Sequence, residues 1–335
     1  MKIHKKASAS SQRRPMGRPI RFFREKGFML FCILMATALP ALAALFCGGH
    51  KRAEDPAPWE ERQVEMRRHE GERGEVLDYA QILSLSLAAT NGSDTPPDSL
   101  AAQAVALRSR GIWWMDYCKE TDSQGRAPHH LCDSPAHGLP YLSMEELISL
   151  YGEEEANLRA EAGRVAVERT KGMVLTYEDD VIPALLHHAS VGHTRAVESL
   201  PWLSRVSSPE AGGEWERKIP SEEFRLSLAA SFGIELSPDP WEWSLETLAD
   251  GNGWVKQVTI GEKAVSGDEF AHALALPSVA FSMEVGLEGV IVTACGEGSG
   301  CGLSRQGASV YARGGLTWQE ILAHYYPECR LERME

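Results

Sequence analysis

An almost uncharged apolar run from Phe28 to Phe46 lies near the start of this 335-residue chain and restricts what the remaining sequence can form. The run is about long enough to cross a bilayer, although Pro40 interrupts it. Lysines and arginines crowd residues 1–27 before it, and basic flanks of this kind stay in the cytoplasm. We therefore expect a basic cytoplasmic segment, a membrane segment over residues 28–46 and a folded part outside the cytoplasm.

Two forms of this membrane segment fit the sequence. An uncleaved anchor would give a single-pass protein of the inner (cytoplasmic) membrane, with its C-terminal domain outside the cytoplasm. The small residues Ala41, Ala43 and Ala44 fit a cleaved signal peptide equally well, and cleavage would leave the domain secreted. Export of everything after Cys47 is expected in both cases.

The charge balance excludes one class of partner. The formal net charge is −13 at pH 7, and the basic residues that cluster lie in the N-terminal segment. Binding to a phosphate backbone depends on clustered lysine and arginine, so nucleic acid is not the expected partner.

The sequence after the membrane segment divides into two parts. Residues 51–75 are rich in Glu and Arg, contain Pro56 and Pro58 and show no sustained apolar face, which predicts a charged linker or an exposed helix. Residues 76–331 show neither an internal repeat nor a second break in composition. One large domain with sub-lobes is the simplest prediction for them.

Helical and strand patterns are mixed in this domain. Apolar residues at helical spacing follow Asp98 as far as Met115, and a second helical pattern starts at Ser143 and breaks near Gly152. A short helix precedes Pro327. Strand patterns separated by turn residues occupy residues 173–177, 254–260, 281–285 and 289–294. The mixture predicts an α+β fold.

Four stretches of the domain, taken in order, resemble the stage II sporulation protein D (SpoIID) and LytB amidase-enhancer family. They are SLAAQAVALRSR (99–110), TKGMVLTYEDDVIPALLHHASVGHT (170–194) with PWLSRVSSPE (201–210) after it, WVKQVTIGEKAVSGDEFAHALALPSVAF (254–281) and CGEGSGCGLSRQGASVYARGGLTWQEILAHYYP (295–327). The last stretch resembles the family's GHGVGMSQYGA motif and its terminal TYEEILKHYYP. The shared order of the stretches implies homology over most of the domain.

This resemblance implies a lytic transglycosylase that cuts peptidoglycan strands stripped of their stem peptides. The reaction needs a carboxyl group that protonates the glycosidic oxygen and then takes the proton from the sugar's own 6-hydroxyl group. In the family a Glu before the first helix does this, and ungapped counting from Gln103 places the position at Thr90. A threonine hydroxyl is too weak an acid near neutral pH, so we expect reduced or absent lytic activity.

Two acids lie close to Thr90 in the sequence, Asp94 and Asp98. A role as helix N-cap is favoured for Asp98. An active lytic transglycosylase that uses Asp94 is one alternative function. A protein that recruits or enhances a cell-wall amidase is another, as the family name suggests.

The residues that face the glycan strand depart in part from the family pattern. Ser299 stands where the family has the His of GHG, Leu186 where it has a Tyr, and Val191 where it has a loop glycine. The resemblance still implies that the strand is contacted by Gln103, Arg108, His187, Ser190, Gly192, Thr194, Ser299 and Ser304.

The loop between the two helical patterns has residue types that suit zinc. It contains Cys118, His130, Cys132 and His137, and the Cys-Asp pair followed by His resembles a zinc-binding loop of the family. Four protein ligands would make such a zinc structural. A disulfide between Cys118 and Cys132 is the other possibility in an oxidising compartment.

Cys295 and Cys301 flank the glycine-rich sequence GEGSG. We expect a short disulfide loop between them, favoured slightly over free thiols.

Overall fold

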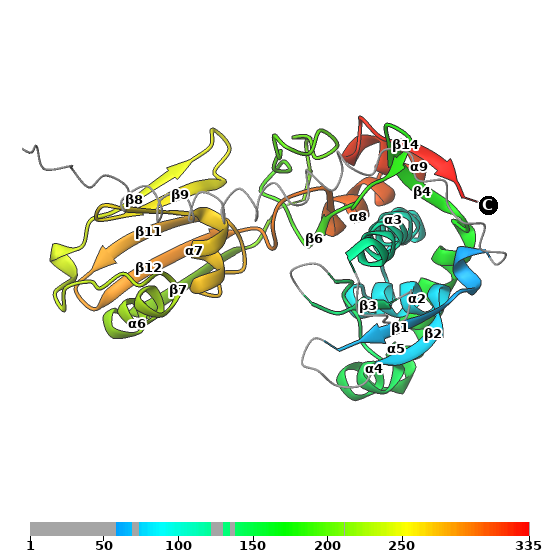
Figure 1. The fold of residues 1–335 in the computed structure, drawn as a ribbon, viewed down its shortest axis with the longest axis horizontal. Helices are drawn as coiled ribbons and strands as arrows, with labels where there is room; N and C mark the ends of the chain where they lie inside the picture. The colour runs from blue at the N-terminus through cyan, green and yellow to red at the C-terminus, as the bar shows by residue number, and fades with distance from the viewer. Residues whose placement is uncertain (1–57, 69–73, 122–129, 135–137, 211, 335) are drawn as a thin grey trace, which may run out of the picture. The chain divides into compact units, whose positions relative to one another are not determined.

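A computed structural model describes residues 58–68, 74–121, 130–134, 138–210 and 212–334 (Figure 1). Ala53–Glu335 form one compact unit, distinct from Met1–Arg52. The expected cytoplasmic and membrane segments lie outside the described residues. Among the helices that the structure describes, none is both long and apolar enough to span a membrane.

The helical part of the chain is centred on one long helix. It comprises α2 (Tyr79–Thr90), α3 (Pro97–Thr121), α4 (Met144–Tyr151) and α5 (Glu153–Arg169). The helix predicted after Asp98 is α3, but Asp98 lies in its first turn, where its carboxylate accepts a hydrogen bond from the backbone N–H of Trp318 at 3.1 Å. The predicted break is confirmed, because Gly152 adopts a φ of 84° between α4 and α5.

A three-stranded sheet borders these helices, and two of its strands precede them in the sequence. After η1 (Trp59–Glu61), β1 (Gln63–Arg67) pairs antiparallel with β2 (Glu75–Asp78) and parallel with β3 (His130–Cys132). Val64 and Met66 are 0% exposed and pack in the same core as α3. The prediction of a linker or exposed helix is therefore wrong over β1, since two apolar residues alternating with charged ones are enough to bury one face of a short strand.

Segments from the C-terminal part of the sequence complete the helical part. β14 (Arg330–Arg333), β4 (Met173–Tyr177) and β5 (Asp180–Val181) form one sheet, and β6 (Leu186–His187) pairs in parallel with β13 (Leu303–Ser304). The helix α8 (Arg305–Arg313) follows β13 directly, and α9 (Trp318–Tyr325) lies between α8 and β14 in the sequence. Both β4 and the short helix before Pro327 agree with the sequence prediction.

Residues 214–295 form a β-rich part with its own core. Its sheets have the orders β11-β12-β7 and β10-β9-β8. The elements are β7 (Glu214–Pro220), α6 (Ser221–Phe232), η2 (Pro240–Glu242), β8 (Leu245–Ala249), β9 (Val255–Ile260), β10 (Lys263–Ser266), α7 (Gly267–Ala273), β11 (Ala280–Gly286) and β12 (Gly289–Cys295). Phe224, Trp254 and Phe270 are buried between them. The predicted strands correspond to β9, β11 and β12, and the α+β fold class is confirmed.

The expected disulfide between Cys295 and Cys301 is not formed, and both are free thiols. Cys295 ends β12, whereas Cys301 is buried in a core that α3 also lines, with its Sγ 3.6 Å from the backbone oxygen of Ser299. Cys132 is a free thiol as well, and the side chain of Cys118, its expected disulfide partner, lies outside the described residues.

Candidate functional site

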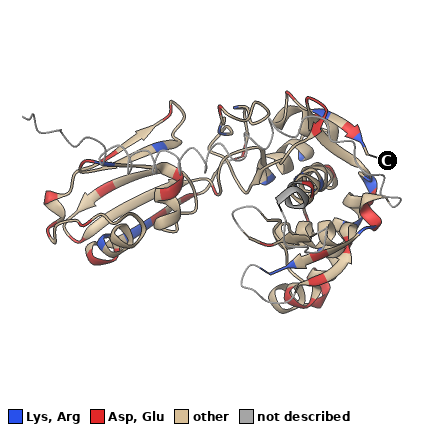
Figure 2. Cartoon of the chain, in the orientation of Figure 1, with Lys and Arg blue, Asp and Glu red and all other residues tan. Residues whose placement is uncertain are grey.

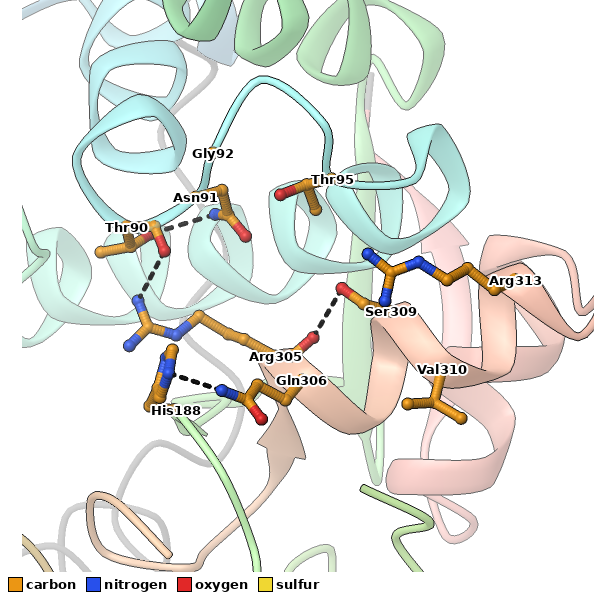
Figure 3. Close-up of a pocket in the computed structure, with 10 residues that line it drawn as sticks. All are labelled: Thr90, Asn91, Gly92, Thr95, His188, Arg305, Gln306, Ser309, Val310 and Arg313. Atoms are coloured by element: carbon orange, nitrogen blue, oxygen red, sulfur yellow. Dashed lines mark hydrogen bonds between the residues drawn. The ribbon is translucent and has the colours of Figure 1, made fainter. Parts of the chain in front are cut away.

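A cavity of about 280 Å³ lies where the loop that follows α2 faces α8 (Figure 3). We call it the Thr90–Arg305 pocket. Its lining consists of Thr90, Asn91, Gly92, Thr95, His188, Arg305, Gln306, Ser309, Val310 and Arg313. The predicted acid position, Thr90, therefore does line a cavity, and no Asp or Glu is among the described residues that line it.

Thr90 turns its hydroxyl group back onto its own helix. Its Oγ1 donates to the backbone oxygen of Ser86 at 3.0 Å. The next residue, Asn91, is buried and exchanges two amide hydrogen bonds with Gln103 of α3, at 2.9 and 3.0 Å. Gln103 is thus a buried support for the loop at the pocket, and the expected glycan contact at this residue is not what the structure shows.

The opposite wall is one face of α8. Arg305, Ser309 and Arg313 are spaced by four residues, which places them in a row along the helix. The Arg305 Nη1 atom donates to the backbone oxygen of Thr90 at 3.5 Å, while its Nε is buried without a hydrogen-bond partner. Burial lowers the pKa of the Arg305 guanidinium, but an arginine stays charged in proteins. The wall is therefore positively charged.

His188 lines a third side of the pocket. The amide of Gln306 donates to its Nε2 at 2.9 Å, and burial lowers the pKa of the imidazole. The Oε2 atom of Glu297 lies 3.8 Å from the same nitrogen. Because the neutral imidazole is favoured, the positive charge of the pocket resides on its two arginines.

The carboxylates near the pocket are not poised to donate a proton into it. Glu155 accepts hydrogen bonds from Arg159 at 2.7 Å and from the hydroxyl group and the backbone N–H of Ser93 at 2.7 and 3.2 Å, and these bonds lower its pKa to about 2. Asp94 is exposed, and neither it nor Glu297 lines the cavity. A general acid needs a carboxyl group that is protonated and in reach of the substrate oxygen.

A buried carboxylate that the sequence predictions missed lies behind α8. Glu210 accepts hydrogen bonds from the backbone N–H of Ser190 at 2.6 Å and from the hydroxyl groups of Ser208 and Ser304 at 2.6 and 2.5 Å. Ser304 in turn caps α8 by accepting from Gly307 N–H, and a Cβ atom on Gly307 would lie 2.5 Å from Glu210 Oε2. Glu210 thus positions the start of the helix that carries Arg305. The sequence signal that could have found Glu210 is its position at the end of residues 201–210, a stretch that resembles the family and closes with Ser-Pro-Glu.

His187, expected to contact the glycan, is a buried scaffold residue. Its Nδ1–H donates to the backbone oxygen of Cys301 at 3.0 Å, and its Nε2 accepts from the hydroxyl group of Ser190 at 2.6 Å. Burial lowers the pKa of His187 to about 4. The neutral ring therefore ties the loop after β6 to the loop before β13.

The remaining predicted contacts also lie away from the pocket. Arg108 is 0% exposed and pairs with Glu60, with 3.1 Å between Arg108 Nε and a carboxylate oxygen. Thr194 is buried and donates to the backbone oxygen of Ser204 at 2.9 Å. Gly192 is exposed and Ser299 half-buried, but neither lines the cavity.

The zinc prediction falls only partly on described residues. His130 and Cys132 flank the buried Leu131 in β3, so both face away from the core. His137 and the side chain of Cys118 lie outside the described residues. No group of three or more potential ligands occurs within the described part of the chain, and a zinc site here stays a proposal.

Comparisons with known proteins match the same domain. The family model of stage II sporulation protein, SpoIID, matches residues 72–177. Stage II sporulation protein D of Bacillus subtilis (strain 168) is 28% identical over 242 residues, which are 69% of this chain and 67% of that protein. The protein of the same name from Bacillus amyloliquefaciens is 28% identical over 245 residues, 69% of this chain and 67% of that protein. An uncharacterized protein of Brachyspira hyodysenteriae is 25% identical over 255 residues, 70% of this chain and 61% of that protein.

Proposed function

We propose that this relative of stage II sporulation protein D binds the glycan strands of peptidoglycan in the Thr90–Arg305 pocket without cleaving them. The observation that carries the proposal is the pocket lining, in which the described residues include Thr90 at the expected acid position and two arginines but no carboxyl group. The names of the relatives support a role in sporulation, and the predicted membrane segment supports a location at the outer face of the membrane.

The chemistry of the pocket argues against cleavage. Protonation of a glycosidic oxygen requires a carboxyl group with a raised pKa, and burial or a neighbouring carboxylate is the usual cause of such a rise. A guanidinium beside the reacting position acts in the opposite direction, because it stabilises the ionised form of any acid placed there. The Arg305 Nη1 atom lies 3.5 Å from the backbone oxygen of Thr90 and would do this.

The test uses the chain from Ala53 to Glu335, which is a compact unit by itself. It is incubated with strands stripped of stem peptides, and binding and anhydro-sugar products are both measured. We expect binding without products, only trace products from Thr90→Glu, and more from Thr90→Glu combined with Arg305→Gln, because the second change removes the guanidinium that would keep the new acid ionised.

The controls separate this account from an enzyme that uses another acid. The Asp94→Asn and Glu297→Gln variants, like the unmodified chain, should release no anhydro-sugar products. If the unmodified chain releases anhydro sugars and either substitution abolishes the release, the chain is an active lytic transglycosylase. If no strand binds, glycan recognition itself is rejected.

A further inference from the structure

The helix α5 has two faces, and the described part of the chain packs against only one of them. On the inner face Gly163 lies so close to α2 that a Cβ atom there would be 2.5 Å from the backbone oxygen of Ser84. On the outer face Leu158 is 53% exposed and Val165 is 48% exposed, and neither belongs to a core of the described residues. At about 3.6 residues per turn, both lie on the side of the helix opposite Gly163.

The apolar residues of the outer face have the spacing of a helix that packs against another helix. Leu158, the half-buried Ala162 and Val165 follow one another at steps of four and then three residues. Such steps keep apolar side chains in one stripe along a helix, and a second helix can pack its own stripe against it. The stripe therefore has the geometry of one half of a helix pair.

Three exposed glutamates border this stripe at intervals of seven residues, namely Glu154, Glu161 and Glu168. Glu161 pairs with Arg164 at 2.8 Å, but the two side chains are 58% and 62% exposed, and exposed pairs of this kind are weak. On the ribbon coloured by charge, acidic residues mark both α4 and α5 (Figure 2). We call the apolar stripe and these three glutamates the outer face of α5.

The charges of this face favour one kind of occupant. In a helix pair, charged residues beside the apolar stripe interact across the interface and determine which partner is accepted. Glutamates at every seventh position favour lysine or arginine on the other helix. A second copy of α5 would offer the same glutamates, while its Arg159 and Arg169 are engaged with Glu155 at 2.7 Å and with Asp98 at 2.8 Å. An anionic lipid surface would be repelled.

We propose that the outer face of α5 docks an amphipathic helix of another protein, whose apolar stripe is flanked by lysine or arginine. The docked helix would cover Leu158 and Val165 and would pair its basic residues with the glutamates. The proposal goes beyond the glycan binding proposed above, because no residue of the outer face lines the Thr90–Arg305 pocket.

The experiment measures the dissociation constants of Ala53–Glu335 for three synthetic peptides by fluorescence anisotropy. The first is a helix with leucines at steps of four and three residues, flanked by lysines. The second has glutamate in place of those lysines, and the third has the composition of the first with its spacing scrambled. We expect the first to bind about tenfold or more tightly than either of the others, since like charges that face each other across an interface are strongly unfavourable.

Reversal of the charges should reverse the choice of peptide. In the triple variant Glu154→Lys, Glu161→Lys and Glu168→Lys, we expect the glutamate peptide to bind more tightly than the lysine peptide. The matched control makes the same change of charge at three exposed glutamates of the β-rich part and should keep the preference for lysine. Its substitutions are Glu246→Lys, Glu262→Lys and Glu284→Lys.

Removal of the apolar stripe should weaken binding without changing the charge. We expect Leu158→Ser combined with Val165→Ser to reduce the affinity for the lysine peptide to that for the scrambled peptide. The control pair is Leu226→Ser with Leu287→Ser, whose side chains are 61% and 74% exposed. Circular dichroism confirms that each variant is folded before it is compared.

Two other outcomes would overturn the proposal. Equal affinity for the lysine and scrambled peptides, or equal effects of the outer-face variants and their controls, would mean that basic peptides are attracted to the acidic domain in general. A dimer of Ala53–Glu335 that dissociates on Leu158→Ser with Val165→Ser, measured by analytical ultracentrifugation, would assign the face to a second copy of this chain.

Discussion

The surroundings of Arg108 and Arg305 put the same side chain to two different uses. Arg108 is 0% exposed, pairs with Glu60 at 3.1 Å and donates to the backbone oxygens of Val167 and Met173, both at 3.1 Å. Arg305 lines a cavity and forms no ion pair with a described carboxylate, whereas the Nε atoms of both arginines are buried without a hydrogen-bond partner. The first guanidinium holds elements together, and the second has donors left for a ligand. The sequence motifs placed Arg108, and not Arg305, among the expected glycan contacts.

The largest expected effect comes from a truncation that removes Glu60, the partner of Arg108, together with the strand β1. A chain that begins at Val76, the domain boundary that the sequence suggests, lacks β1, Trp59 and Glu60. We expect it to lose cooperative unfolding, because the core of α3 loses Val64 and Met66 and the buried guanidinium loses its carboxylate. Circular dichroism during heating measures this against Ala53–Glu335. Equal melting temperatures would show that β1 is dispensable.

A single substitution tests the same ion pair. Glu60→Ala should lower the free energy of unfolding by about 3–5 kcal/mol, since loss of one partner leaves the other charge buried and uncompensated. The adjacent Glu61 is the control, because its side chain is 61% exposed and lies 3.6 Å from Lys171. Glu61→Ala should cost at most about 1 kcal/mol. Denaturant titration of both variants decides, and similar losses would contradict the assignment.

The pH dependence of stability tests the scaffold that the pocket shares with His187. Burial lowers the pKa of His187 from 6.5 to about 4, so the unfolded chain binds this proton first as pH falls. Its contribution is fully present above pH 6.5 and is lost progressively as the pH falls to about 4, by on the order of 3 kcal/mol in total. NMR titration of the His187 ring is the direct measurement. An imidazole that becomes charged near pH 6.5 would contradict the burial argument.

The smallest expected effect is on the stability of the free protein when Arg305 is changed. Arg305→Gln removes a partly buried charge that forms no ion pair with a described carboxylate, so we expect a change within about 1 kcal/mol, or a small gain. Arg108→Gln should cost several times more, about 3 kcal/mol or above. Equal losses in denaturant titrations would mean that both arginines are structural and would remove the contrast.

The sequence predicted the regular elements better than the site. α3, the break at Gly152 and strands such as β4 carry strong local patterns, and all of them are present. β1 was missed because a strand with two apolar residues among charged ones gives a weak local signal. The ion pair of Arg108 with Glu60 was missed because it joins residues far apart in sequence, which no local pattern reveals.

The site shows the same limit. Counting along a motif placed the lost acid at Thr90, and the structure puts that residue at a cavity. Counting along a motif could not show that Gln103, His187 and Ser304 are buried, since a motif that is retained for packing resembles one that is retained for contact with a ligand. The arginines of α8 were passed over because the motif drew attention to its serines and glycines.

The order of contacts along the chain bears on how the pocket forms during folding. The buried residues of the core around Trp254 all lie within residues 219–294, with Val191 and Trp215 packed against them, whereas the cores that α3 lines also need Trp59 from the N-terminal side and Tyr325 and Tyr326 from the C-terminal side. Contacts between distant residues form slowly, because loop closure must come first. We expect pulse-labelled hydrogen exchange to protect the β-rich part early and α3 late. In a chain exported from its N-terminus, the wall that carries Arg305 and Arg313 would then be among the last parts to form, so an incompletely translocated chain would have no ligand pocket.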